Sequence, residues 1–168
     1  HSKINLESQR ENGERFTPHV LEIAFGTDRP TYALIDMFYE KKAEAEGKTS
    51  FSIPYHMAPI DVSVFPLMKK PELTKLAKDV KEELERDFIV EYDESGSIGR
   101  RYLRSSTAGT PFALTIDFDS LTNQDVTIRD RNSASQIRVP IADLRKIIHH
   151  LINQEIEFDK AGKAVKKE

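Results

Sequence analysis

The chain has 168 residues, a formal net charge of -3 and no cysteine, and 38% of its residues are hydrophobic. This length and composition predict one domain, or one domain with part of another, around a modest core. The lack of cysteine excludes disulfides, a thiolate metal site and a thiol nucleophile, and the net negative charge argues against a general nucleic-acid coat.

No apolar run reaches the roughly 20 residues that a membrane-spanning helix needs, and the first residues lack the charged, apolar and small-residue order of a signal peptide. We therefore expect a cytoplasmic protein without a membrane partner. The five histidines contain no pair at metalloprotease spacing, and a helix would point the adjacent His149 and His150 apart. We expect no metal site.

The N-terminal part of the chain predicts a strand and a helix that precede a linker. The apolar run from Val20 to Phe25 is typical of a strand. A helix is expected from about Pro30 to Ala45, because proline fits the first helical turn. Gly47 and Lys48 then look like a linker.

The next four elements alternate between strand and helix. The β-branched run from Asp61 to Pro66 predicts a buried strand. Apolar residues then recur at helical spacing from Pro71 onward, which predicts a long amphipathic helix. A second strand from Phe88 to Tyr92 leads through a glycine turn into a short helix around Ile98 to Ser106, which Gly109 is expected to end.

Three further strands and a helix complete the order. Phe112 to Phe118 is expected to be the third strand, Val126 to Arg131 and Gln136 to Val139 form a hairpin around NSAS, and IADLRKIIHHLIN is an amphipathic helix. The order β-α-β-α-β-β-α predicts an α/β fold with a mixed sheet of about five strands and about three helices. Its first three strands are expected to be parallel.

These elements divide the chain into three parts. Residues 1–48 hold the first strand and helix, residues 49–158 hold the mixed sheet, and residues 159–168 form a polar tail that we expect to be frayed. Ligands of such sheets gather beyond the carboxyl ends of the parallel strands. The turn DESGSIG, residues 93–99, lies at one of those ends.

Glycines and arginines mark this turn as a candidate binding site. Gly96 and Gly99 permit a sharp bend or the close approach of a ligand. The turn has neither the ending of a P-loop nor the spacing of a dinucleotide site, so we do not predict nucleotide hydrolysis. From Gly96 onward every cation up to residue 138 is an arginine: Arg100, Arg101, Arg104, Arg129, Arg131 and Arg138. Arginine's planar fork suits phosphates and base edges. Salt bridges to neighbouring acidic residues explain the first three of these arginines equally well.

Two strand patterns place charged residues on one face. If TIDFD is a strand, Asp117 and Asp119 share a face. No histidine, lysine or nucleophile is near enough in sequence to complete a catalytic pair, but a carboxylate can accept a hydrogen bond from the amino group of cytosine. Arg129 and Arg131 likewise share a face of their strand. A single solvent-exposed face is the simplest explanation for both patterns.

Two residues of the N-terminal part are candidates for binding a small ligand. The segment GTDRP puts Arg29 at a strand-to-helix junction, where its guanidinium could clamp a phosphate. Glu22, within the expected strand, could accept a hydrogen bond from an amino group. A capped helix start explains the same pattern without a ligand.

Several of these segments together resemble the C-terminal part of glycyl-tRNA synthetases of the archaeal and eukaryotic dimeric type. FTPHVLEIAFGTDRPTYALID is similar to the third class II signature motif, and VEYDESGSIGRRYLRSSTAGTPFALTIDFD with VTIRDRNSASQIRV is similar to that family's anticodon-binding domain. The resemblance covers about Phe16 to Ile152, and SGSIGRRY and TIRDR are its most specific parts.

The resemblance implies a class II anticodon-binding domain, preceded by the end of a catalytic domain. It implies that the chain is the tRNA-binding part of a ligase that joins glycine to tRNA using ATP and Mg²⁺, as a homodimer that binds no DNA. Arg29 then matches an arginine that binds ATP phosphates, and Glu22 a glutamate that holds the glycine amino group. The implied anticodon contacts are Glu94, Ser97, Gly99, Arg100, Arg101, Arg104, Asp117, Asp119, Arg129 and Arg131. Glycine anticodons end in two cytosines, which suits the carboxylates among them.

The sequence departs from the family pattern at one point. Ile23 and Ala24 stand where the family usually has proline and serine. In addition, nothing before Phe16 resembles the first two class II motifs, so we expect the chain by itself to be inactive and to hold no cofactor. A second interpretation is a synthetase-like paralogue that acts as a polymerase accessory subunit or an interaction domain, and Ile23 and Ala24 favour it.

Overall fold

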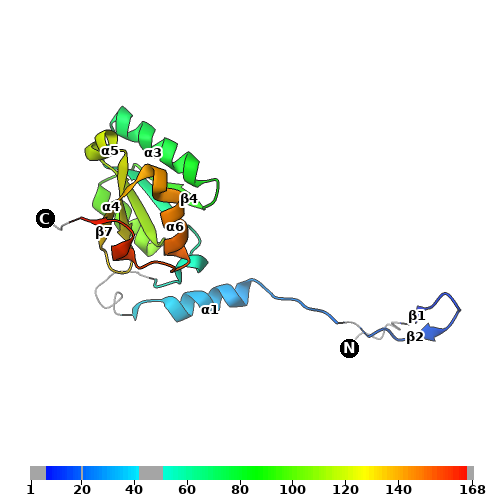
Figure 1. Cartoon of the computed structure of the whole chain (residues 1–168). Coiled ribbons are helices and arrows are strands. Elements are labelled where there is room, and N and C mark those ends of the chain that lie inside the picture. Colours follow the sequence, from blue (N-terminus) through cyan, green and yellow to red (C-terminus); the bar gives the residue numbers. More distant parts are fainter. Residues whose placement is uncertain (1–6, 20, 42–50, 166–168) are drawn as a thin grey trace. The chain divides into compact units, whose positions relative to one another are not determined.

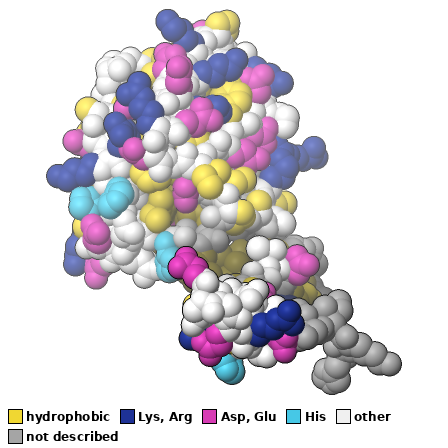
Figure 2. Space-filling model, turned by 90° about the vertical axis from the view of Figure 1, so that its right-hand side faces the viewer, with side chains coloured by type: hydrophobic (Ala, Val, Ile, Leu, Met, Phe, Trp, Pro, Cys, Tyr) yellow, Lys and Arg dark blue, Asp and Glu magenta, His cyan; other side chains and the backbone are white. Residues whose placement is uncertain are grey.

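The computed structural model describes residues 7–19, 21–41 and 51–165 (Figure 1). The chain divides into two compact units, His1–Tyr32 and Ala33–Glu168. Within the described ranges, no helix has both the length and the apolar character that crossing a membrane requires. One face of the space-filling view shows Lys and Arg side chains interspersed with Asp and Glu rather than gathered into a basic field (Figure 2).

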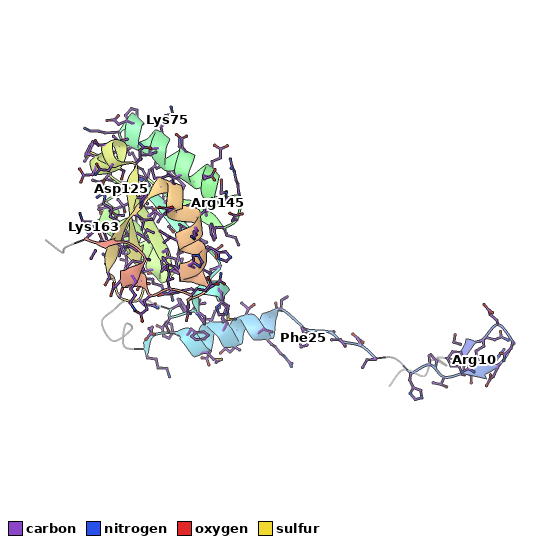
Figure 3. The ribbon with its side chains drawn as sticks, viewed as in Figure 1. Arg10, Phe25, Lys75, Asp125, Arg145 and Lys163 are labelled. Atoms are coloured by element: carbon purple, nitrogen blue, oxygen red, sulfur yellow. The ribbon has the colours of Figure 1, made fainter. Side chains whose placement is uncertain are left out.

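The first unit contains a small hairpin, β1 (Ser8–Gln9) and β2 (Arg15–Phe16), that the sequence did not predict. The strand expected from Val20 to Phe25 is wrong for residues 21–25, which belong to no strand, while Val20 lies outside the described residues. A strand needs a neighbour that completes its ladder, and the described residues offer none here. Apolar side chains therefore stay in solvent, with Phe25 87% exposed (Figure 3).

The expected helix in this region is α1 (Asp28–Phe38), with Pro30 in its first turn. α1 is followed by Tyr39, which forms an isolated bridge to Phe51, and residue 41 is helical again. The last residues of the predicted helix, from 42 onward, lie outside the described residues.

A six-stranded mixed sheet forms the centre of the second unit (Figure 1). Its order is β4-β3-β5-β6-β7-β8, and β4, β3 and β5 are mutually parallel, as the sequence predicts. The remaining strands pair antiparallel. The strands are β3 (Val62–Pro66), β4 (Val90–Tyr92), β5 (Phe112–Ile116), β6 (Asp125–Asp130), β7 (Gln136–Pro140) and β8 (Lys163–Ala164).

Helices cover both faces of the parallel part of this sheet. On one face α3 (Pro71–Leu84) and α6 (Leu144–Ile152) bury their apolar sides against alternate strand residues such as Val62 and Leu114. On the other face α4 (Ile98–Thr107) hydrogen-bonds through Ser105 Oγ to Ser63 Oγ at 2.9 Å. The crossover from β3 to β4 and the crossover from β4 to β5 run in opposite directions across the sheet, so right-handed connections place α3 and α4 on opposite faces.

Burial on both faces explains the apolar runs of the central strands. All five residues of β3 and all five of β5 are buried, as expected for strands covered on both sides. Gly109 follows Ala108, the C-cap of α4, and its φ of 85° is the left-handed conformation that a glycine at a helix end is expected to adopt. Single turns of 3-10 helix lie at η1 (Tyr55–Met57), η2 (Ile141–Asp143) and η3 (Phe158–Lys160).

The strand expected to run through TIDFD ends early, at Ile116. A short helix, α5 (Phe118–Asn123), begins there instead, and Asp117 is its N-cap. Asp117 Oδ1 accepts from Ser120 N at 3.0 Å while Asp117 N donates to Ser120 Oγ at 3.1 Å, so the two residues form a capping box. The strand alternation inferred for Asp117 and Asp119 is therefore wrong.

The expectation of a frayed tail is also wrong for the residues up to 165. β8 pairs with β7, with Arg138 opposite Lys163, and Val165 N donates to Gln136 O at 2.9 Å. The outer edge of β7 supplies the ladder bonds that a polar segment can use as well as an apolar one. Gly162 fits this approach because a Cβ there would lie 2.7 Å from Arg138 O.

Candidate nucleic-acid interface

Three segments meet beyond the carboxyl ends of the parallel strands, at what we call the carboxyl edge. They are residues 67–70 after β3, residues 93–97 after β4 and residues 117–119 at the start of α5. Leu67 N donates to Ile116 O at 2.8 Å, which holds the first segment beside the third. This is the position at which α/β sheets bind ligands.

Arg101 joins two of these segments from inside the protein. Its side chain is only 2% exposed, and its guanidinium donates to Pro66 O at 2.5 Å and to Leu67 O at 3.2 Å. A weaker bond reaches Asp93 O at 3.4 Å. The arginine thus satisfies carbonyls that the strand ladder leaves free. The resemblance assigned Arg101 to the tRNA surface, but its burial leaves no donor for an RNA contact.

Arg104 holds the glycine turn in shape. Its guanidinium pairs with Asp93 and donates to Ser95 O at 2.8 Å, while Asp93 Oδ1 accepts from Ser95 N at 2.7 Å. Partial burial by itself would raise the pKa of Asp93, but the hydrogen bonds from Arg104 and Ser95 outweigh it and lower that pKa to about 2. Gly96 follows with a φ of 71°, so the turn requires glycine.

The solvent side of the carboxyl edge carries unpaired cations and an aromatic ring. Arg100 is exposed and has no hydrogen bond or ion pair within the described part of the chain. Lys70 Nζ lies 4.6 Å above the ring of Phe118, which is 42% exposed. Ser97, the N-cap of α4, keeps its hydroxyl free of any capping bond. Cations beside an exposed aromatic ring are the usual components of a single-stranded RNA site.

The three candidate carboxylates differ in how far they are already engaged. Asp117 caps α5 and accepts two bonds from Arg138, at 2.6 and 3.1 Å. Partial burial would raise the pKa of Asp117, but these bonds outweigh it and the pKa is lowered. The Asp119 side chain is 76% exposed and lies 3.8 Å from Arg138, and Glu94 accepts from Tyr92 Oη at 2.6 Å. Asp119 and Glu94 therefore retain free acceptor capacity.

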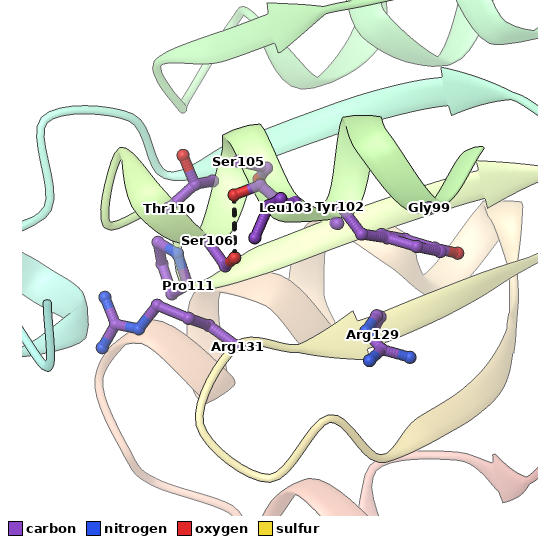
Figure 4. Close-up of a pocket in the computed structure, with 10 residues that line it drawn as sticks. Gly99, Tyr102, Leu103, Ser105, Ser106, Thr110, Pro111, Arg129 and Arg131 are labelled. Atoms are coloured by element: carbon purple, nitrogen blue, oxygen red, sulfur yellow. Dashed lines mark hydrogen bonds between the residues drawn. The ribbon is translucent and has the colours of Figure 1, made fainter. Parts of the chain in front are cut away.

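A pocket of about 260 Å³ runs along α4 from the carboxyl edge (Figure 4). Gly99, in the first turn of α4, lines one end, and no atom lies within 4 Å of the position of a Cβ there. Tyr102 and Leu103 continue the helical wall, and Arg129 and Arg131 from the β6 side lie opposite (Figure 4). Apolar walls with a few polar groups can hold a planar base.

Only one of the two pocket arginines is free. Arg131 donates to Gly109 O at 2.5 Å and to Ile53 O at 2.6 Å, so it fastens the chain ahead of β3 to the end of α4. Arg129 stacks 4.9 Å above the Tyr102 ring and makes no hydrogen bond or ion pair with any described residue. Its planar fork is available to a ligand.

Beyond α4, the same sheet face continues over β6 and β7. Arg129 is opposite Gln136, and Thr127 is opposite Arg138, so these residues share the α4 side of the sheet. Arg138 is occupied, with Asp125 at 2.9 Å in addition to Asp117. The hydrogen bond to Asp117 is the largest cause that raises the pKa of Arg138, although partial burial by itself would lower that pKa. Of the two arginines that β6 and β7 place on this face in the described chain, Arg129 is thus the free one.

The two candidates of the N-terminal part lie in the first unit. Glu22 and Arg29 are both exposed and form no ion pair with a described residue. Arg29 lies in the first turn of α1, as expected.

Sequence reasoning missed three residues of this interface. Lys70 and Phe118 come from two different strand-to-helix junctions. Tyr102 lies in α4, a helix in which the sequence analysis considered the arginines and not the aromatic residue. The exposed Phe118 has a sequence signal, because the aspartate-to-serine spacing of Asp117 and Ser120 is an N-cap pattern. No sequence signal indicates that Arg129 stacks on Tyr102, because the two residues lie in different elements, β6 and α4, that only the fold brings together.

The fold is that of a domain found in aminoacyl-tRNA synthetases. Two structures of prolyl-tRNA synthetase from Cryptosporidium parvum superpose on 62% of this chain and 23% of theirs, with TM-scores of 0.59 and 0.58 and identities of 19% and 20%. The family described as anticodon binding domain matches residues 61–151. The chain belongs to this family.

Glycine-tRNA ligases are similar over most of the chain. Identity is 42% over 142 residues with the ligase of Methanococcus maripaludis strain C5, which covers 84% of this chain and 24% of the relative. It is 43% over 150 residues with that of Pyrococcus abyssi (89% and 26%) and 40% over 143 residues with that of Bacillus cereus strain ZK (84% and 31%). The predicted resemblance is confirmed. The chain spans about a quarter to a third of the length of these relatives.

Proposed function

We propose that this chain binds the anticodon loop of glycine tRNAs, as the RNA-binding part of a ligase that attaches glycine to tRNA using ATP. Family membership over residues 61–151 carries the proposal. The unpaired cations and the exposed ring at the carboxyl edge, together with the adjoining α4 pocket, support it as a surface for splayed bases.

The proposed contacts follow from which side chains remain free. Arg100 and Arg129 contact phosphates or bases, and Phe118 provides a face on which a base stacks. Glu94 and Asp119 accept from cytosine amino groups, because Asp117 is already saturated by Arg138 and Ser120. Arg101, Arg104 and Arg131 hold the loops that present these groups.

The remaining features belong to the longer ligase. There, Arg29 would contact the phosphates of ATP and Glu22 the amino group of glycine, with Mg²⁺ accompanying the nucleotide. We propose that this ligase is a cytoplasmic homodimer, and that the chain by itself does not activate glycine. Exchange of pyrophosphate into ATP that depends on glycine and on this chain would contradict the last point.

The central experiment compares two stem-loops. A glycine anticodon stem-loop should bind at least about tenfold more tightly than one whose two cytosines are changed to uracils, because uracil offers a carbonyl where cytosine offers an amino donor. Fluorescence anisotropy at fixed salt measures both affinities. Equal affinity for the two would overturn anticodon recognition and favour the paralogue interpretation.

Two variants with matched controls locate the readers. Asp119→Asn should reduce the preference for cytosine, and Arg129→Lys should weaken binding because lysine lacks the planar fork. The exposed Asp159→Asn and Arg86→Lys, which lie away from the carboxyl edge in sequence and element, should leave both affinities unchanged. Unaltered preference in Asp119→Asn would assign the reading to Glu94 instead.

A further inference from the structure

Helix α6 ends in a capping motif that brings three potential metal ligands together. Gln154 has a φ of 57°, and its N donates to Leu151 O at 3.1 Å. Glu155 N donates to His150 O at 2.9 Å. These two bonds define a Schellman motif, in which the residue after the left-handed one packs against the last helical turn. Glu155 is therefore folded back onto His150.

The side chains that meet there are imidazoles and a carboxylate instead of the usual apolar pair. His150 Nδ1 and Glu155 Oε2 are hydrogen-bonded, and the rings of His149 and His150 lie edge to face with centroids 6.1 Å apart. One ligand atom from each of the three residues lies within 4.8 Å of the other two. The expectation that the adjacent histidines point apart is wrong, because a ring nitrogen of each lies within 4.8 Å of the other and of a carboxylate oxygen of Glu155.

The chemistry of this set suits a borderline transition metal. Two imidazoles and one carboxylate match Zn²⁺, Ni²⁺ or Cu²⁺, whereas Mg²⁺ and Ca²⁺ prefer sites built of oxygen. All three side chains reach solvent, with His150 half-buried and the other two exposed. The site also lies at the C-terminal end of α6, where the helix dipole favours a cation.

We propose that His149, His150 and Glu155 bind one divalent transition-metal ion, Zn²⁺ or Ni²⁺, at the C-terminal end of α6. The ion takes the place of the direct hydrogen bond between His150 Nδ1 and Glu155 Oε2, and a ring nitrogen of His149 is the third ligand. His149 exchanges its present neighbour for the ion, since Asn153 Nδ2 lies 3.3 Å from its Nδ1. Water completes the coordination.

Calorimetric titration of the 168-residue chain with ZnCl₂ and with NiCl₂ tests the proposal. One ion should bind per chain, and MgCl₂ should give no comparable heat. His149→Ala and Glu155→Gln should each weaken Zn²⁺ binding at least about tenfold, because even the loss of a residue that only supports a ligand costs 10- to 100-fold. His56→Ala and Glu157→Gln remove a histidine and a carboxylate elsewhere and should bind like the parent.

Thermal melts separate lost ligation from lost folding. Zn²⁺ should raise the melting temperature of the parent chain and of His56→Ala, because it binds the folded state. His149→Ala should melt like the parent without metal, since this side chain is exposed, and should show no rise with Zn²⁺. Equal Zn²⁺ affinity in the parent, His149→Ala and Glu155→Gln would overturn the site.

Discussion

Arg100 and Arg101 are neighbours in the chain but belong to different environments. The guanidinium of Arg101 is buried among the carbonyls of Pro66, Leu67 and Asp93, and Arg100 is in solvent. Arg101→Ala should lower the free energy of unfolding by about 2–4 kcal/mol, because it leaves buried carbonyls without donors. Arg100→Ala should change it by less than about 0.5 kcal/mol. Urea denaturation of both variants measures the difference, and equal stability would contradict the assigned roles.

Asp93 makes the glycine turn sensitive to acid. Its pKa in the folded chain is about 2, below the ordinary 3.8, so its stabilising contribution is complete above about pH 5 and is lost as pH falls toward 2. The contribution is on the order of 1 kcal/mol, since Arg104 is half exposed to solvent. Denaturation of the parent and Asp93→Asn between pH 2 and 7 tests this. Their stability difference should shrink as the pH falls, and a constant difference would contradict it.

The junction of β4 and α4 contains two glycines with opposite requirements. Gly96 has a φ of 71°, so Gly96→Ala should destabilise the chain by about 1–2 kcal/mol. Gly99 lies inside α4 with open space where a Cβ would sit, so Gly99→Ala should stabilise the chain by about 0.5–1 kcal/mol. The added methyl group nevertheless enters the α4 pocket and should weaken RNA binding. Thermal melts and stem-loop titrations of the two variants check both statements; a destabilised Gly99→Ala would refute the second.

At the scale of the whole molecule, the mixed sheet needs little of the N-terminal part. The buried core begins at Ile53 in the described chain, and every strand of the sheet lies after residue 60. A chain that begins at residue 51 should therefore unfold cooperatively, with a melting temperature within a few degrees of the full chain. Loss of cooperative unfolding would show that residues before 51 contribute to the core.

The net charge of -3 means that local cations have to attract RNA without a general basic field. With about three phosphate contacts, the logarithm of the stem-loop affinity should fall with the logarithm of salt concentration with a slope of about -2. Arg100→Ala should make this slope shallower by about 0.7 if it contacts a phosphate. Titrations over a range of KCl concentrations measure it, with Arg86→Ala as the matched control. An unchanged slope would remove Arg100 from the phosphate contacts.

Sequence patterns alone predict the order of the elements from β3 to α6 apart from α5, the parallel arrangement of β3, β4 and β5, and the resemblance to the family. Apolar periodicity and glycine placement are local signals, and each predicts an element without information about the segments that pack against it. The strand prediction is wrong for residues 21–25 for the same reason, because an apolar run becomes a strand only when a partner supplies its ladder. The polar tail shows the opposite outcome. It has no apolar run that would predict a strand, yet it forms β8 because β7 supplies a partner for its ladder.

Which charged side chains are free to bind a ligand depends on tertiary contacts. Five arginines look alike in the sequence but differ in their roles. Backbone carbonyls of neighbouring loops accept hydrogen bonds from three of them, and the other two are unpaired in the described chain. The bonded arginines are Arg101, Arg104 and Arg131, and the unpaired ones are Arg100 and Arg129. Likewise Asp117 is saturated by Arg138 from β7, while Asp119, two residues later, points into solvent. The burial and the ion pairing of a charged side chain depend on which elements pack together in the fold, and the spacing of residues along the sequence does not show this.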